Sequence, residues 1–286
     1  MFEPLQYEFF VRGLIAATMV GALCGLIGVY IVLRRMSYIG HGLSHAVFGG
    51  AVVSYVMNFN FYLGASIWGF LAALLINLTT RRRKVIGADA AIGIITTASF
   101  ALGVALISRY KTFTRSFDAA LFGNILGVTQ GDLLAIGAVT AATFVVVMAA
   151  YKRLLFMSFD PEVARFYGVP TEWLDTLLSL ILAAAIVVSM QVMGVTLIAA
   201  AIVIPPIVAR LLTDSFSKVM VLSVVVGAAC GLVGMYLSYF VDVSSGANVV
   251  LVAAAAFVLA MAYSGLRNRL ATARGALAMR EQTVLE

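Results

Sequence analysis

The sequence predicts an all-α, polytopic membrane protein with about nine (eight to nine) transmembrane helices. Hydrophobic residues make up 63% of the 286 residues, charged residues only 11%, and the mean hydropathy is +1.05. A soluble domain averages about 45–50% apolar and about 25% charged residues, so this composition excludes an ordinary soluble domain. The apolar residues also occur in successive long runs, as a bilayer core about 30 Å thick requires of helices that cross it.

Nine apolar runs follow one another with short connections, and each is expected to form a helix. They occupy residues 13–33, 42–57, 64–80, 90–108, 131–150, 173–191, 194–212, 219–240 and 249–266. The second and third runs are short, which leaves a count of eight open. Gly13, Gly21, Gly25 and Gly28 in the first run predict close helix packing. Pro205-Pro206 in the seventh predicts a kink or a break in that helix.

The distribution of basic residues predicts the orientation. If Arg34 and Arg35 are cytoplasmic, fifteen of the 19 Lys and Arg residues fall on the cytoplasmic side. The four on the other side are Arg12, Arg109, Lys111 and Arg115. The positive-inside rule then places the N-terminus outside and the C-terminus inside a cell (plasma or inner) membrane. Residues 1–286 form a single transmembrane domain, with residues 267–286 as a short cytoplasmic tail.

The two histidines of the chain, His41 and His45, lie four residues apart in an apolar segment. Residues i and i+4 share one face of a helix, so both imidazoles can reach the same point. Imidazole is a ligand for zinc and similar borderline metals, and a polar group inside a membrane suggests function. A rise of about 1.5 Å per residue from Arg34 places His45 near the membrane midplane. We expect the pair to bind a metal, although interhelical hydrogen bonding is the alternative.

A cytoplasmic loop between the fifth and sixth runs predicts a short amphipathic helix at residues 158–169. Asp160 suits the N-cap, Pro161 the first helical position and Glu162 the positive end of the helix dipole. Gly168 is placed to end a two-turn helix. Its apolar side carries Phe159, Val163, Phe166 and Tyr167, which predicts a protein interface or, alternatively, a membrane-surface connector. Because the sequence has no GxxxxGK[ST] motif, any ATPase must be a separate subunit.

Four stretches of sequence resemble the permease subunits of zinc/manganese ABC importers, the ABC-3 family. They are Leu33–Met36 with Leu43–Val47, Leu121–Gly127, Phe159–Gly168, and Gly194–Leu212. The resemblance implies a non-enzymatic permease that moves Zn or Mn, has no cofactor of its own and forms a dimer, here a homodimer. Its expected partners are cytoplasmic ATP-binding subunits and an extracytoplasmic metal-binding protein, in a lipid membrane and without nucleic acid.

The resemblance also suggests roles for particular residues. Residues 158–169 look like the coupling helix that docks on the ATPase, through Phe159, Asp160, Pro161, Glu162, Arg165, Phe166, Tyr167 and Gly168. The usual family pattern has an Asp four residues before the second histidine, and here His41 occupies that position. Imidazole nitrogen is a softer donor than carboxylate oxygen, which favours zinc, iron or nickel over manganese.

The histidine pair also fits two other classes of function. An ion-gradient-driven carrier or channel could use the same histidines, but coupling normally places acidic residues inside the spans. Here Asp89, Asp132, Asp175 and Asp214 lie near span boundaries. An intramembrane zinc protease of the HExxH type is disfavoured because Gly42 follows His41.

Overall fold

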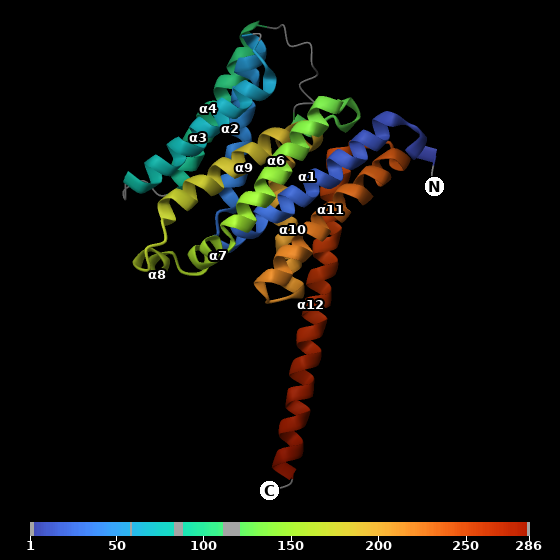
Figure 1. The fold of residues 1–286 in the computed structure, drawn as a ribbon. Helices are drawn as coiled ribbons and strands as arrows, with labels where there is room; N and C mark the ends of the chain where they lie inside the picture. Colours follow the sequence, from blue (N-terminus) through green and yellow to red (C-terminus); the bar gives the residue numbers. More distant parts are fainter. Residues whose placement is uncertain (1–2, 58, 83–87, 111–120, 285–286) are drawn as a thin grey trace.

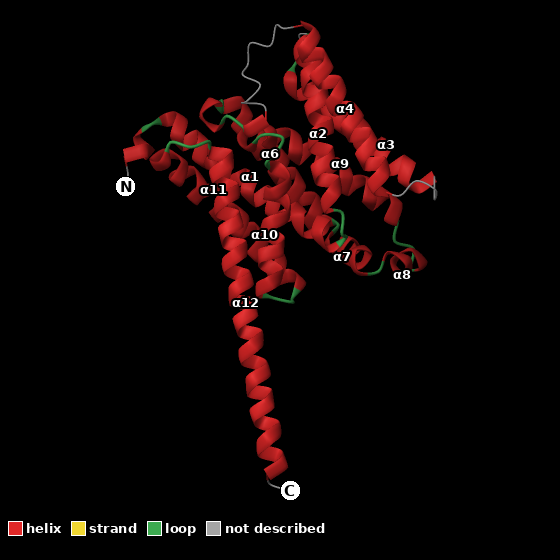
Figure 2. Cartoon of the chain, turned by 180° about the vertical axis from the view of Figure 1, so that it is seen from behind, coloured by secondary structure: helices red, strands yellow, loops and turns green. Residues whose placement is uncertain are grey.

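The computed structural model describes residues 3–57, 59–82, 88–110 and 121–284, and within these ranges all regular structure is helical (Figure 2). The long helices are α1 (Glu8–Leu33), α2 (Ser37–Val56), α3 (Phe61–Arg82), α4 (Ala88–Tyr110), α6 (Gln130–Ala149), α9 (Thr171–Met193), α10 (Ile198–Leu212), α11 (Phe216–Val241) and α12 (Ser245–Val284). The short ones are η1 (Glu3–Gln6), η2 (Ile125–Gly127), α7 (Tyr151–Phe159) and α8 (Pro161–Phe166). Arg83, Lys84, Lys111 and Arg115, used above to predict the orientation, lie outside the described residues.

Each of the nine apolar runs forms a helix in the described chain, although residues 194–197 of the seventh run precede α10. Seven of these helices are long and apolar enough to cross a membrane, namely α1, α3, α4, α6, α9, α11 and α12. The helix α10 is apolar but has only 15 residues. The helix α2 has 20 residues, but its histidines, serines and glycines lower its hydropathy. Long apolar helices are therefore confirmed, while the count of eight or nine spans stays a prediction.

The helices form two groups with α9 between them (Figure 1). One group contains α2, α3 and α4, which pack on one another. The other contains α1, α10, α11 and α12, with α6 packed on α1. The helix α9 contacts α2 and α3 on one side and α1 and α6 on the other, and it carries many buried apolar residues. The core of the protein therefore extends through both groups.

The close pairing of α1 with α11 depends on glycines, which have no side chain to separate the two backbones. A Cβ atom at Gly21 would lie 2.1 Å from the carbonyl oxygen of Gly227, so only glycine allows this approach. One turn later, the Ser223 hydroxyl donates a 2.7 Å hydrogen bond to the carbonyl of Gly25. Small residues of this kind allow backbones to pack closely in lipid, where no hydrophobic effect drives helices together. The predicted glycine packing surface of the first run is confirmed.

The sequence predicts a kink or a break at Pro205-Pro206, and the break is not found. The helix α10 runs through both prolines from Ile198 to Leu212. The irregular backbone lies before it, at residues 194–197, where Gly194 has a φ of 76°. Thr196 donates a side-chain hydrogen bond of 2.8 Å to the carbonyl of Leu121, so this segment packs against the chain that precedes η2. Irregular backbone at such a place is tolerated because its polar groups bond to protein.

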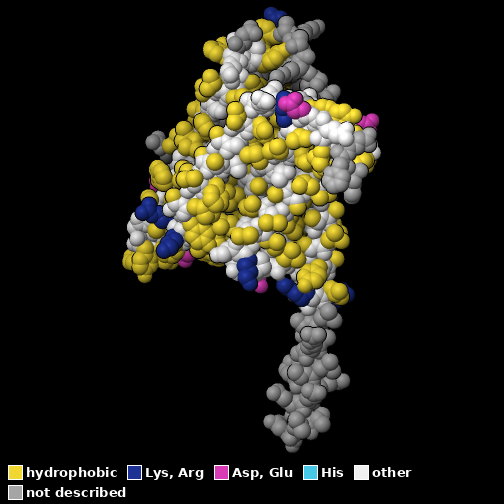
Figure 3. Space-filling view, turned by 45° about the vertical axis from the view of Figure 1, so that its right-hand side comes forward, with side chains coloured by type: hydrophobic (Ala, Val, Ile, Leu, Met, Phe, Trp, Pro, Cys, Tyr) yellow, Lys and Arg dark blue, Asp and Glu magenta, His cyan; other side chains and the backbone are white. Residues whose placement is uncertain are grey.

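The surface has two distinct zones. Hydrophobic side chains cover the body of the protein, and most of the Lys and Arg side chains visible in this view gather along its lower edge (Figure 3). The helix α12 continues past that edge as far as Val284 (Figure 1). Residues 267–284, expected only as a polar tail, thus prolong the last helix.

Candidate metal site and cytoplasmic docking helix

His41 and His45 lie on one face of α2, as their spacing predicts. Their ring centroids are 4.7 Å apart and the ring planes are nearly perpendicular, at 86°. His41 is exposed, whereas His45 is half-buried and packs edge-on against Phe100 of α4, with centroids 4.9 Å apart. The two rings are close enough to contribute nitrogen ligands to one ion after small side-chain rotations.

The half-buried His45 has an unused ring nitrogen. Its Nδ1 atom is buried and has no hydrogen-bond partner in the described chain. Buried side-chain nitrogens are normally hydrogen-bonded, so an orphan of this kind calls for an explanation such as a bound ion or water. The neighbouring hydroxyl of Ser44 does not supply a partner, because it donates to the carbonyl of His41 at 2.7 Å.

The close packing of α2 on α4 fixes the place of His45. A Cβ atom at Gly49 would lie 2.2 Å from the carbonyl oxygen of Ser99, and one at Gly42 would lie 2.5 Å from Ile92. The polar residues that α4 brings to this contact are Thr96 and Ser99, and both donate to carbonyls of their own helix. The interface therefore orients the His45 ring without adding an obvious third ligand.

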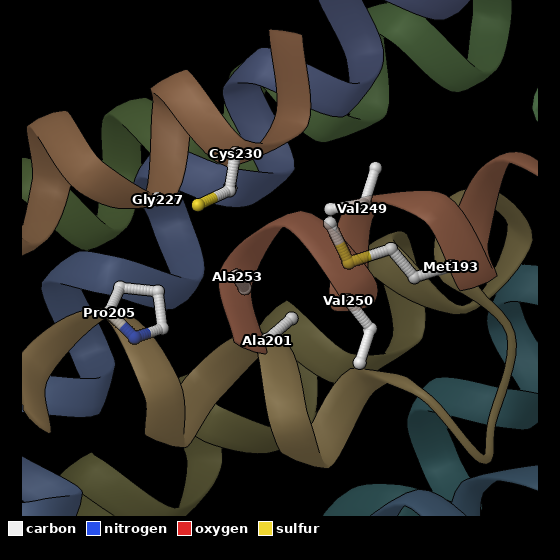
Figure 4. A pocket seen from close by; sticks show the side chains of 9 residues that line it. Met193, Ala201, Pro205, Gly227, Cys230, Val249, Val250 and Ala253 are labelled. Carbon is white, nitrogen blue, oxygen red and sulfur yellow. The ribbon is translucent and has the colours of Figure 1, made fainter. Parts of the chain in front are cut away.

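Two imidazoles do not complete a coordination sphere. Within the part of the chain that the structure describes, no group of three or more His, Cys, Asp or Glu side chains is placed to hold a metal ion. A small cavity between α1, α10, α11, α12 and the end of α9 does not change this, because its lining is apolar, with Met193, Pro205, Cys230 and Val249 among its residues (Figure 4). The histidine pair is thus the best candidate metal site, with at least one further ligand to come from elsewhere.

The short helix α8 is built as its sequence predicts at both ends. The backbone N–H groups of Glu162 and Val163 donate to the Asp160 carboxylate at 3.1 and 2.9 Å, and Pro161 follows this N-cap. At the other end Gly168 has a φ of 78°, a left-handed conformation that favours glycine. The predicted cap and stop signals are confirmed.

The helix itself is shorter than expected. A two-turn helix was predicted, but α8 has six residues, and Phe159 belongs to the end of α7. The cause is local, since the capping residue Asp160 is extended and the backbone turns again at Tyr167–Gly168. Phe166 and Tyr167 are 87% and 72% exposed, and Phe159 is also exposed. We call Phe159, Phe166 and Tyr167 the aromatic surface.

The remaining residues of this segment have distinct environments. Ala164 is fully buried and fixes α8 to the body of the protein. Glu162 is exposed, and Arg165 donates from Nε to the hydroxyl of Thr171, the first residue of α9, at 3.4 Å. The aromatic surface therefore spans the end of α7 and the end of α8, and α8 contacts α9 through the Arg165–Thr171 hydrogen bond.

Sequence reasoning missed two polar contacts between helices. Arg34 at the end of α1 forms an ion pair with Asp175 of α9. Tyr62 of α3 donates to the carboxylate of Asp132 at the start of α6, a residue that also takes part in a capping box with Thr129. The available signal was the presence of charged residues at the ends of apolar runs, but sequence spacing does not reveal which of them meet.

Comparison with known proteins decides the family. Residues 6–264 match the ABC 3 transport family. The chain belongs to the ABC 3 transport family. The match covers all nine long helices except the last part of α12, so it describes the chain as a whole. The chain is accordingly a multi-pass membrane protein of an ABC transport system, and its relatives are membrane subunits of such systems and not enzymes themselves.

Relatives of known role cover almost the full chain. It is 38% identical over 260 residues to the manganese transport system membrane protein MntC of Listeria monocytogenes. The alignment covers 91% of this chain and 92% of that protein. It is 36% identical over 269 residues to a Haemophilus influenzae protein described as a probable iron transport system membrane protein. That alignment covers 94% of this chain and 98% of the relative. A solved structure, PsaBC from Streptococcus pneumoniae in complex with Fab, matches with a TM-score of 0.82 at 35% identity, covering 91% and 93%.

Proposed function

We propose that this chain forms the translocation pathway of an ATP-driven importer of divalent transition-metal ions. The observation that carries the proposal is the histidine pair of α2, with the orphan Nδ1 of His45, in a member of the ABC 3 transport family. His41 and His45 bind the passing ion, which is the substrate. Relatives named for manganese and for iron support this class of substrate.

The donor atoms narrow the choice of ion only in part. Two imidazole nitrogens suit zinc, iron and nickel, and they favour manganese less than a carboxylate would. Selectivity in cells also depends on metal availability and on the delivering protein. Zinc and manganese therefore both remain within the proposal, and competition between the two ions is the way to rank them.

A second copy of the chain is the proposed source of further ligands. His41 is exposed on the surface of this chain, so a neighbouring helix or water can approach it. Homodimers with two-fold symmetry are the commonest oligomers, and such a dimer brings the same surface of each copy together. We propose a homodimer whose pathway runs between the two copies, each contributing its α2.

The remaining parts of the importer are separate proteins. Cytoplasmic ATP-binding subunits dock on the segment 158–169, where the aromatic surface is exposed at the ends of α7 and of the capped helix α8. Large aromatic side chains are the usual centres of binding energy in interfaces, and their exposure here suggests a partner. An extracytoplasmic metal-binding protein delivers the ion on the opposite side of the cell membrane.

The proposed orientation follows from the surface. Basic side chains gather at the edge from which α7, α8 and the end of α12 project, which is where the positive-inside rule places the cytoplasm (Figures 1 and 3). With nine spanning helices, including α2 and the short α10, the N-terminus lies outside and the C-terminus inside.

Reconstitution tests the function directly. The permease, its ATPase and its binding protein are placed in liposomes, and uptake of Mn²⁺ and Zn²⁺ is measured with and without ATP. The proposal predicts ATP-dependent uptake of at least one of the two ions. Uptake that follows an ion gradient and ignores ATP would instead support a carrier.

A further inference from the structure

An ion pair joins the lower ends of α1 and α9. Arg34 caps the C-terminus of α1, and its Nη1 atom contacts Oδ1 of Asp175, in the second turn of α9. The two side chains are only 13% and 26% exposed. The two contacting atoms are themselves buried and neither has a hydrogen-bond partner in the described chain, so the contact between them is an ion pair without hydrogen-bond geometry. Because a buried charge is costly when it has no partner, each of these groups depends on the other to stay in place.

Arg34 stands directly before the helix that carries the histidines. The N–H of Arg34 bonds to the carbonyl of Tyr30, and the N–H of Met36 bonds to that of Ile31, which closes a tight turn at the end of α1. The helix α2 begins at Ser37, and His41 is about one helical turn further on. A displacement of the Arg34 turn therefore moves the start of α2 and the imidazoles with it.

Asp175 lies in the second turn of α9, the helix that follows α8 after a short turn. The turn between α8 and α9 is closed by the bond from the N–H of Val169 to the carbonyl of Ala164, at 3.0 Å. Ala164 and Leu174 are both fully buried in one cluster, which also contains Tyr30 of α1. A displacement of α8 is therefore transmitted to the first turns of α9, where Asp175 lies.

We propose that the Arg34–Asp175 ion pair is the positioning contact that links α8 to α2, so that movement of the docked ATPase changes the position of the histidine pair. Arg34 and Asp175 act through other residues and need not touch the metal. This inference rests on the proposed function, and it adds a specific route by which hydrolysis at one surface changes the ion site on another helix.

The test separates coupling from assembly. The complete complex is reconstituted in liposomes, and two quantities are measured: ATP hydrolysis without substrate, and metal ions imported per ATP hydrolysed. The variants are Asp175→Asn, Arg34→Gln, and the exchange of both residues, Arg34→Asp with Asp175→Arg. The control is Glu8→Gln, which removes the exposed ion pair with Arg12 at the other end of α1.

The proposal predicts that each single variant retains its ATPase subunit and its basal hydrolysis, while the number of ions imported per ATP falls at least tenfold. The exchange variant recovers to within about threefold of the original protein, and Glu8→Gln is unchanged. A single variant within twofold of the original, an exchange variant as impaired as the singles, or release of the ATPase would each overturn the proposal. If the unaltered complex imports no metal, the proposed function itself fails, and this inference fails with it.

Discussion

The carbonyl oxygen of Ile202 lies directly against the backbone of Gly28. A Cβ atom at Gly28 would lie 2.0 Å from that oxygen and 3.0 Å from the ring of Pro206. Pro206 has no N–H group, so the Ile202 carbonyl has no partner four residues along α10. The approach of α1 covers this carbonyl with the Cα of a glycine, and contacts of the Cα–H···O kind are common between closely packed helices.

We expect Gly28→Ala to destabilise the protein. The new methyl group cannot fit without moving α1 away from α10, and overpacking of this kind typically costs about 1–3 kcal/mol. The measurement is the thermal unfolding midpoint of the detergent-solubilised permease, which should fall by several degrees. Gly40→Ala is the control, because its Cβ atom would meet only the Cδ1 of Ile202, at 3.9 Å. Equal midpoints for the two variants would show that α1 and α10 are not held this closely.

Replacing the capping residue of α8 should have a mild effect. Asp160→Ala removes the acceptor for two backbone N–H groups, and loss of an N-cap costs about 1 kcal/mol. We expect weaker binding of the ATPase, by roughly fivefold, with unchanged metal binding. Asp160→Asn is the control, because asparagine is an equally good cap. If Asn weakens binding as much as Ala does, the negative charge matters and the cap does not.

Removing the aromatic surface should weaken ATPase binding far more than removing the Asp160 cap. Phe166→Ala with Tyr167→Ala removes two large exposed side chains without opening a cavity in the core. We expect the ATPase subunit to be lost from the purified complex, or to hydrolyse ATP without transport. Phe240→Ala is the matched control, because it removes an exposed aromatic side chain at the far end of α11. Full coupled transport by the double variant would make residues 158–169 a simple connector.

The identity of the first histidine should set part of the ion preference. His41→Asp replaces a nitrogen ligand with a harder oxygen ligand, which favours Mn²⁺ over Zn²⁺. Competition uptake, with both ions present at equal free concentration, should show a higher ratio of Mn²⁺ to Zn²⁺ for the variant. His41→Asn controls for the change in size. An unchanged ratio would mean that the delivering protein selects the ion.

The sequence predicts the helices well because apolar periodicity and capping residues act locally. The N-cap of α8 and the positive φ of Gly168 follow directly from Asp160, Pro161 and Gly168. The continuity of α10 could not be predicted in this way, because the carbonyl freed by Pro206 is covered by Gly28, far away in the chain. At that point tertiary packing outweighs the tendency of proline to break a helix.

In the candidate site, too, the sequence predicts the local features and leaves the tertiary contacts unpredicted. The spacing of His41 and His45 predicts a shared helix face, and the structure confirms it. Their role as metal ligands stays a prediction. The burial of the His45 Nδ1 atom and the contact with Phe100 depend on how α4 packs, and the ion pair of Arg34 joins residues on α1 and α9. Contacts of that kind are visible only in three dimensions.

The most direct test of the account is metal uptake by the complete complex with His41→Ala and His45→Ala combined. The control is Ser44→Ala, on the same helix, whose hydroxyl donates to the backbone carbonyl of His41. Radioactive Mn²⁺ and Zn²⁺ are supplied with ATP, and the amount of ATPase subunit bound to each permease is matched. We predict that the double variant assembles normally but loses at least 95% of its uptake, while Ser44→Ala keeps its rate. At tenfold per 1.4 kcal/mol, that loss corresponds to roughly 2 kcal/mol. Uptake by the double variant at the original rate would show that the ion binds elsewhere and would contradict the account.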